Sequence, residues 1–324
     1  MAKAIRIHSH GGPEVMRWED VPTNEPGVGE ALVRHTAVGL NYIDVYFRSG
    51  LYKTPALPAT LGMEAAGQVI AVGPGVSEVA IGDRVAYATG PIGAYSTQRV
   101  IAADRLLRLP DYIDDQVGAA MMLQGLTAQY LLRRTHQVKS GEFIIIHAAA
   151  GGVGLIACQW AHAIGAIVIG VVSTQAKAEL ARANGATHVV IGHHELAAEV
   201  KHITGGGMVS VVYDSVGRDT YAASVDCLAP LGLMVSFGNA SGPVPPIDLA
   251  TLSAKGSLFI TRPTLATYTA KYEDLQNAAR ELFEAVRDGA IKIRVNQRFA
   301  LQDAANAHRA LESRQTTGST ILIP

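Results

Sequence analysis

The stretch that decides the fold reads FIIIHAAAGGVG and runs from Phe143 to Gly154. Its first five residues, Phe143–His147, are dominated by isoleucine and predict a buried strand. The glycines that follow permit a tight turn, and the apolar run Leu155–Ile164 predicts a helix that ends at Gly165. Strand, turn and helix in this order predict the first βαβ unit of a parallel sheet.

Five further strands follow this unit at regular intervals. They are Ile167–Val172, His188–Ile191, Val209–Tyr213, Leu233–Phe237 and Ser257–Thr261. Helical patterns separate the first five strands of the series, which is typical of consecutive βαβ units. Six strands complete a Rossmann sheet, so we predict a doubly wound α/β fold over residues 126–262.

The sequence before this region is of a different kind. Residues 1–125 are rich in Gly and Pro and carry short strand-like runs, namely Ala31–Val38, Gln68–Val72 and Arg84–Ala88. A chain of 324 residues accommodates about two domains. We therefore predict a mostly β domain over 1–125. An amphipathic helix over 271–288 precedes a C-terminal tail. We expect this tail to pack on the β domain, so residues 263–324 are assigned to that domain.

The glycine turn also predicts a ligand. Glycine lets the backbone approach a pyrophosphate closely, and the helix that follows offers free N–H groups at its positive end. The residues expected to bind a dinucleotide are Gly151, Gly152, Val153 and Gly154. Ala149 stands where the usual motif has its first glycine, and a plain βα turn is the alternative.

The tip of the second predicted strand indicates which dinucleotide is bound. In NAD-binding sites an acid about 20 residues after the glycines holds the ribose 2′-hydroxyl. Here Ser173 follows the strand and Lys177 comes one helical turn later, with no carboxylate between them. This pattern favours NADPH. The alternatives are that Ser173 is a helix cap and Lys177 a solvated helix residue.

Composition restricts the partners and the compartment. Lys and Arg number 27 against 28 Asp and Glu, so nothing indicates nucleic acid or an anionic membrane as partner. No apolar stretch is long enough for a membrane span or shaped as a secretion signal. The two cysteines, Cys158 and Cys227, lie in separate apolar stretches and predict packed thiols in a reducing cytoplasm.

Further motifs carry a family resemblance. They are GLNYID at 39–44, LGMEAAG at 61–67, GDRV at 82–85, GLTA at 125–128, YDSVG at 213–217, VSFGNASG at 235–242 and LESR at 311–314. Together with the glycine turn, the whole chain resembles the zinc-free quinone oxidoreductase branch, which includes zeta-crystallin, of the medium-chain dehydrogenase/reductase superfamily. The resemblance implies a GroES-like catalytic domain beside the Rossmann domain, with the active cleft between them.

The resemblance also implies roles for individual residues. Asn41 and Thr127 are expected near the nicotinamide, Tyr46 and Tyr52 along the substrate cleft, Gly217, Phe237, Gly238 and Ser241 beside the cofactor, and Arg314 near its phosphates. Asn41, Tyr46 and Tyr52 form the predicted catalytic set. Aromatic packing is the alternative for the two tyrosines, and a surface ion pair is the alternative for Arg314.

The residues that would bind zinc are missing. Zinc-dependent relatives place Cys where Asn41 stands, His where Met63 stands, and a four-cysteine lobe afterwards. We therefore predict no metal. Asp44 and Glu64 are expected to be structural carboxylates, paired with basic side chains such as Arg48 or Lys53.

Without a Lewis acid, the substrate should accept hydride readily. We predict an NADPH-dependent quinone oxidoreductase. Reduction of α,β-unsaturated carbonyls is the alternative enzyme activity, and RNA binding, as in some zeta-crystallin relatives, is a less favoured one because the charge is balanced. The last strand, Ser257–Thr261, would form a sheet edge, which together with the resemblance predicts a homodimer.

Overall fold

The computed structural model describes all 324 residues, which divide into two compact units. Unit 1 comprises Met1–Leu126, Thr269–Phe283 and Ile293–Pro324, and unit 2 comprises Thr127–Tyr268 and Glu284–Lys292. The chain passes from the first unit to the second within helix α2 (Asp115–Tyr130). The predicted domain boundaries, after residue 125 and before residue 263, remain a prediction.

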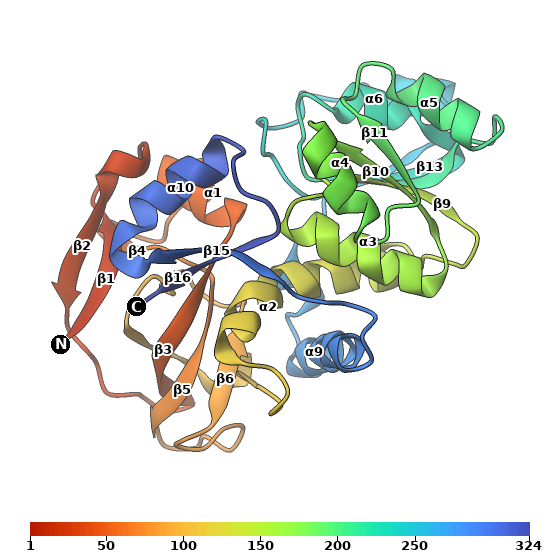
Figure 1. Ribbon diagram of the computed structural model, residues 1–324. Coiled ribbons are helices and arrows are strands. Elements are labelled where there is room, and N and C mark those ends of the chain that lie inside the picture. The colour runs from red at the N-terminus through yellow and green to blue at the C-terminus, as the bar shows by residue number, and fades with distance from the viewer. The chain divides into compact units, whose positions relative to one another are not determined.

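Unit 2 contains the predicted parallel sheet (Figure 1). Its strands are β9 (Phe143–His147), β10 (Ile167–Val172), β11 (His188–Ile191), β12 (Val209–Asp214), β13 (Leu228–Ser236) and β14 (Phe259–Thr261). All neighbours are parallel, in the order β11-β10-β9-β12-β13-β14. This is the strand order of a Rossmann sheet, so the predicted fold class is confirmed.

Helices connect these strands. They are α3 (Gly152–Ile164), α4 (Gln175–Arg182), α5 (Leu196–Ile203), α6 (Tyr221–Asp226) and α7 (Leu249–Ala254). The short helix α8 (Leu265–Tyr268) follows the last strand, and a π-helical turn, η3 (Leu131–Thr135), follows α2. α3 begins three residues earlier than predicted, because the glycines form its first turn, and it ends at Gly165 with φ 94°. α7, between β13 and β14, was not predicted.

Unit 1 is built from two sheets. The smaller sheet contains β1 (Ala2–Ile7), β2 (Met16–Val21) and β4 (Ala59–Thr60). The larger contains β3 (Glu30–Leu40), β5 (Glu64–Val72), β6 (Arg84–Tyr87), β7 (Gln98–Ala102), β8 (Leu107–Arg108), β15 (Val295–Ala300) and β16 (Ser319–Ile323). β16 pairs antiparallel with β3, which brings Ile321 opposite Gly39. The C-terminal tail therefore packs on the N-terminal strands, as predicted.

Four longer helices and three short ones complete the chain. The longer ones are α1 (Tyr42–Ser49), α2, α9 (Tyr272–Arg287) and α10 (Ala304–Glu312), and the short ones are η1 (Pro13–Val15), η2 (Ala103–Arg105) and η4 (Leu301–Asp303). α9 is the predicted amphipathic helix, with Leu275, Ala278 and Leu282 buried on one face. In α2, a Cβ on Gly125 would approach Leu282 Cδ2 to 2.6 Å, so glycine lets the two helices pack closely.

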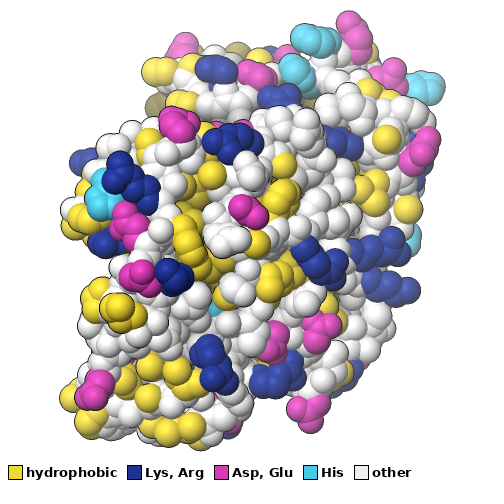
Figure 2. Space-filling model, turned by 60° about the vertical axis from the view of Figure 1, so that its left-hand side comes forward, with side chains coloured by type: hydrophobic (Ala, Val, Ile, Leu, Met, Phe, Trp, Pro, Cys, Tyr) yellow, Lys and Arg dark blue, Asp and Glu magenta, His cyan; other side chains and the backbone are white.

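Each unit has its own apolar core. In unit 1 the sheets bury Ile5, Val33 and Val85, and in unit 2 Ile145 and Met234 are fully buried. On the face drawn in Figure 2, Lys and Arg side chains are interspersed with Asp and Glu. Neither positive nor negative side chains dominate that face. None of the helices is both long enough and apolar enough to span a bilayer.

Candidate functional site

The glycine turn lies between β9 and α3. Ala148 has a left-handed backbone with φ 50°, and its carbonyl oxygen accepts a hydrogen bond of 2.8 Å from the N–H of Gly151. A Cβ on Gly154 would overlap that same carbonyl, so only glycine fits there. No side chain caps α3 at Gly151, and the first N–H groups of a helix have no partner within it. The turn therefore presents free donors and the positive end of a helix.

The tip of the second strand lacks a carboxylate. β10 ends at Val172, and the exposed Ser173 follows it. Thr174, not Ser173, caps α4: its hydroxyl accepts a hydrogen bond of 3.3 Å from the N–H of Lys177. The alternative role of Ser173 as the helix cap is therefore wrong. Glu179 is the first acid after this tip, and it lies well inside α4.

Asp214 organises the loop after β12. Oδ1 of its buried carboxylate accepts hydrogen bonds from the N–H groups of Val216 at 2.7 Å and Gly217 at 3.1 Å. Oδ2 accepts hydrogen bonds from the hydroxyls of Thr220 at 2.6 Å and Ser224 at 2.9 Å. Four donors on one carboxylate fix the path of the backbone through Gly217.

The loop after β13 packs against this loop. The N–H of Phe237 donates to the Asp214 carbonyl at 2.8 Å, and a Cβ on Gly238 would overlap the Ser215 carbonyl. The hydroxyl of Ser241 donates to the Val216 carbonyl at 2.9 Å. The structure therefore brings together the four predicted residues Gly217, Phe237, Gly238 and Ser241.

These features share one edge of the sheet. β10, β9, β12 and β13 are parallel neighbours, so their C-terminal ends meet along that edge. The glycine turn, Ser173 and the two loops all follow directly from these ends. Nucleotides bind at this position in open α/β sheets.

Unit 2 also buries two side chains of types that act as nucleophiles in other enzymes, Ser224 and Cys158. The Ser224 hydroxyl lies 2.9 Å from Nε2 of His147 and also bonds Asp214, so the serine stands between the other two. In a hydrolytic triad the imidazole occupies that middle position. Burial raises the pKa of Cys158 to about 12, which leaves it a packed thiol, as predicted.

Asn41 is the central side chain in unit 1. It precedes α1 and is buried, and its amide makes two hydrogen bonds. Nδ2 donates to Oε2 of Glu64 at 2.6 Å, and Oδ1 accepts from Nε2 of Gln124 at 3.2 Å. Gln124 in turn accepts a hydrogen bond of 2.8 Å from the Ser319 hydroxyl. The amide orientation is therefore fixed by partners from β5, α2 and β16.

The two buried carboxylates of unit 1 differ from the prediction. Asp44 accepts from the N–H of Asn41 at 2.9 Å and from the Tyr95 hydroxyl at 3.0 Å, and not from Arg48 or Lys53. The predicted ion pairs are therefore wrong, because the donors to these carboxylates are hydroxyl, amide and backbone groups. Burial raises the pKa of Asp44 to about 7, and burial raises that of Glu64 to about 8.

The two predicted substrate-lining tyrosines pack on each other. The rings of Tyr46, on α1, and Tyr52 lie 5.2 Å apart, and Tyr42 and Phe47 extend the aromatic cluster. The N–H of Tyr52 also donates to the Tyr46 carbonyl at 3.0 Å. Aromatic packing is thus present, and it fixes the positions of both rings.

Thr127 and Arg314 occupy defined backbone positions. Thr127 is buried in α2, one turn after Gln124. Arg314 follows α10 with a left-handed backbone at φ 59°, and its N–H donates to the Leu311 carbonyl at 3.1 Å. Such a conformation costs a non-glycine residue about 1 to 3 kcal/mol. Burial raises the pKa of Tyr42 and Arg314 lowers it, so the guanidinium acts on the aromatic cluster.

The site does not fit a zinc ion. Asn41 uses its amide for Glu64 and Gln124, and the thioether of Met63 is a poor zinc ligand. Nowhere in the chain do three or more His, Cys, Asp or Glu side chains gather so that they could hold a metal.

Three residues of these networks were missed from the sequence. Gln124 has no local signal, because its partners come from distant segments. Asp214 did have a local signal, because an acid that ends a buried strand and precedes a glycine by three residues is typical of an Asx turn. Arg262, which donates to the carbonyls of Ser236 and Gly238 at 3.0 and 2.9 Å, directly follows β14.

Two domain models match the chain. The GroES-like domain of alcohol dehydrogenases matches residues 27–140, and the zinc-binding dehydrogenase domain matches residues 152–284. The second description names a metal, although the residues present here do not provide its ligands.

Full-length relatives agree with these matches. A quinone oxidoreductase of Pseudomonas aeruginosa is 55% identical, with 100% of both chains covered, and a 2-haloacrylate reductase of a Burkholderia species is 44% identical over 100% of this chain and 99% of its own. The crystal structure of Escherichia coli quinone oxidoreductase complexed with NADPH is 50% identical, with a TM-score of 0.97 over 99% of this chain and 100% of that chain. The chain therefore belongs to the quinone oxidoreductase family of the medium-chain dehydrogenase/reductase superfamily.

Proposed function

We propose that this chain is an NADPH-dependent quinone oxidoreductase. The C-terminal edge of the six-stranded sheet supports this most directly: a glycine turn with free helix N–H groups lies there, beside a strand tip with a hydroxyl, a lysine and no acid. The relatives named quinone oxidoreductase and the related structure complexed with NADPH support the same function.

The residues along this edge fit NADPH. The backbone N–H groups of Gly152, Val153 and Gly154 bind the pyrophosphate at the positive end of α3, and Gly151, whose own N–H bonds the Ala148 carbonyl, forms the turn beside it. Ser173 and Lys177 bind the 2′-phosphate through charge-assisted hydrogen bonds. Gly217, Phe237, Gly238 and Ser241 border the cofactor in the two loops that Asp214 holds, and Arg314 binds a phosphate. When bound, NADPH supplies the hydride.

In unit 1, the side chains provide orientation rather than acid or base chemistry. Asn41 presents the remaining Nδ2 hydrogen of an amide whose direction is fixed. Thr127, the first residue of unit 2, contributes a hydroxyl next to the nicotinamide. Tyr46 and Tyr52 offer ring faces and hydroxyls that orient a flat quinone.

No metal takes part in this proposal, because the donor set for one is missing. The hydride acceptor must then be electron-poor without help from a Lewis acid. Activated alkenes, including α,β-unsaturated carbonyls, meet the same requirement, and the related 2-haloacrylate reductase makes them the second candidate.

We also propose a homodimer and a cytoplasmic location. β14 is an edge strand of the parallel sheet, and Phe259 on it is 59% exposed, which suits pairing with a second copy. Two free, buried cysteines suit a reducing compartment.

The test is turnover with a substrate panel. Purified protein is assayed with NADPH and with NADH against naphthoquinones, benzoquinones, enones and 2-haloacrylate. We expect kcat/KM to be highest for NADPH with a quinone. A higher kcat/KM for the alkenes would favour the alkene reductase, and absence of turnover with every acceptor would refute both.

A further inference from the structure

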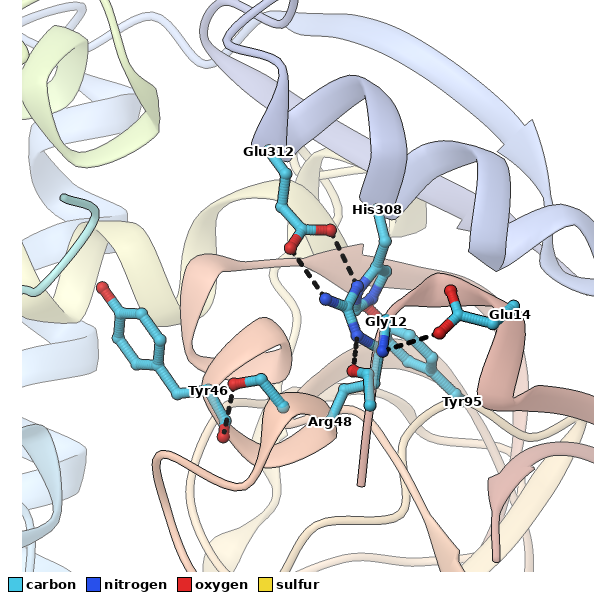
Figure 3. A network of polar contacts seen from close by, with 9 residues as sticks. Gly12, Glu14, Tyr46, Arg48, Tyr95, His308 and Glu312 are labelled. Carbon is cyan, nitrogen blue, oxygen red and sulfur yellow. Dashed lines mark hydrogen bonds and ion pairs between the residues drawn. The ribbon is translucent and has the colours of Figure 1, made fainter. Parts of the chain in front are cut away.

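A chain of buried hydrogen bonds connects α10 to Asp44 in the first turn of α1, and Figure 3 shows three of its members, Arg48, His308 and Tyr95. Nη1 of Arg48 lies 3.0 Å from Nδ1 of His308, and Nε2 of His308 lies 3.0 Å from the Tyr95 hydroxyl. That hydroxyl lies 3.0 Å from Oδ2 of Asp44. All four side chains are buried, so no competing solvent contacts replace these bonds.

The chemistry of the groups gives this chain one direction. A guanidinium can only donate, so Nδ1 of His308 accepts and the imidazole proton sits on Nε2. Nε2–H then donates to the Tyr95 oxygen, and the single hydroxyl proton of Tyr95 donates to Asp44. Burial, together with the charge of Arg48, lowers the pKa of His308 to about 3, so the imidazole stays in this one neutral form.

Both ends of the chain are anchored. Arg48 makes a two-point ion pair with Glu312, at 2.8 and 2.7 Å, and its Nε donates to the Gly11 carbonyl at 3.1 Å. At the other end, the second donor to Oδ2 of Asp44 is the backbone N–H of Asn41, at 2.9 Å. The chain therefore ends on the residue whose amide we assign to the site.

We propose that Tyr95 and His308 are positioning residues for hydride transfer, because through Asp44 they hold the backbone of Asn41 and thereby the place of its amide. Glu64 and Gln124 fix the rotation of that amide, whereas Tyr95 and His308 fix its position. This inference rests on the proposed function and extends it to two residues that act through Asn41.

A comparable histidine–tyrosine pair elsewhere in unit 1 provides a control. The Tyr87 hydroxyl lies 2.8 Å from Nε2 of His35, and Nδ1 of His35 donates to the Ser96 carbonyl at 2.6 Å. Both side chains are buried, but no hydrogen bond of this pair reaches Asn41. Tyr87→Phe therefore removes a similar buried hydrogen bond to a histidine, together with the interaction of the hydroxyl with Arg99, and neither partner bonds Asn41.

The experiment compares Tyr95→Phe, Tyr87→Phe, Asn41→Ala and the double variant Asn41→Ala/Tyr95→Phe with the unmodified chain. For each we measure kcat and KM for 1,4-benzoquinone, Kd for NADPH, and Tm. We expect both single Phe variants to lower Tm by similar amounts. Of these two variants, only Tyr95→Phe should lower kcat, by about tenfold, because a misplaced site residue slows the chemical step. In the Asn41→Ala background, Tyr95→Phe should lower kcat no further.

Two outcomes would overturn the inference. One is a kcat for Tyr95→Phe no lower than that of Tyr87→Phe; the other is an equal loss of kcat with and without Asn41. If Tyr95→Phe does not fold, His308→Gln, which removes the donor to Tyr95, takes its place in the same comparison. Failure of the proposed function is distinguishable, because the unmodified chain would then reduce no quinone.

Discussion

Nδ2 of Asn41 lies 2.6 Å from Oε2 of Glu64, and both side chains are buried. Oε1 of Glu64 accepts a second hydrogen bond of 2.8 Å, from the N–H of Leu123. One carboxyl group thus links the residue before α1 to the middle of α2. The protonation state of Glu64 consequently bears on both stability and the site.

This link makes stability depend on pH. Burial raises the pKa of Glu64 from 4.5 to about 8 in the folded chain, so folding favours the neutral carboxyl. The stability that neutral Glu64 contributes is fully present below pH 4.5 and is lost as the pH rises through 8. The pKa of Asp44 is raised to about 7, so its contribution to stability also falls as the pH rises.

Denaturant unfolding between pH 5 and 9 measures this effect. The free energy of unfolding should fall with rising pH, and the fall should be smaller in Glu64→Gln, whose side chain cannot ionise. Equal slopes in the two proteins would show that Glu64 ionises in the folded chain at its ordinary pKa.

Lys177→Ala should weaken NADPH binding about ten- to a hundredfold, since each charge-assisted hydrogen bond to the 2′-phosphate is worth roughly 1.5 to 3 kcal/mol. NADH binding should hardly change. Isothermal titration of both cofactors measures the ratio. Ser173→Asp is the companion variant, which should repel NADPH and offer the ribose of NADH an acceptor. If Lys177→Ala keeps the preference for NADPH, the 2′-phosphate is bound instead by Arg314 or by His193, which lies two residues after β11.

Gly154→Ala should disrupt the glycine turn, because the added Cβ would overlap the carbonyl oxygen of Ala148. We expect a loss of roughly 1 to 3 kcal/mol in stability, typical of overpacking, together with weaker NADPH binding. Gly207→Ala is the control, because its Cβ would meet only Thr204 O, at an ordinary 3.5 Å. Equal melting temperatures and cofactor affinities in the two variants would contradict the prediction.

Removing metal should leave turnover unchanged, because the chain gathers no set of ligands for it. The protein is dialysed exhaustively against a chelator and assayed with NADPH and a quinone. Metal analysis of the active protein accompanies the assay. Stoichiometric zinc whose removal abolishes the rate would contradict the zinc-independent proposal.

Phe259→Glu should convert the proposed dimer to a monomer, because it places a charge on the β14 edge. Light scattering after size-exclusion chromatography gives the mass directly. Ile81→Glu is the control, since Ile81 is 66% exposed in unit 1 and lies in no strand. If the unmodified chain is a monomer at every concentration tested, the dimer proposal is wrong.

The sequence by itself predicted the elements of unit 2 closely. Three of the six strands, β9, β10 and β11, have the predicted bounds, because apolar runs between turn residues are local signals. β13 begins at Leu228, five residues earlier than predicted, since Leu228 pairs with Val209 across an irregularity in the ladder. β14 begins two residues later, because Ser257 has a left-handed backbone at φ 58° and cannot continue a strand.

The local sequence also determined the glycine turn and the absence of an acid after β10. Only the tertiary structure decided what the polar side chains of unit 1 do. Arg48 meets Glu312 across 264 residues, and Tyr95 meets His308 across 213. Hydropathy identifies residues that are buried, but a buried polar group takes whichever donor or acceptor the packed sheets and helices bring within about 3 Å. That choice depends on how β3, β16, α1 and α10 come together, which no local pattern encodes.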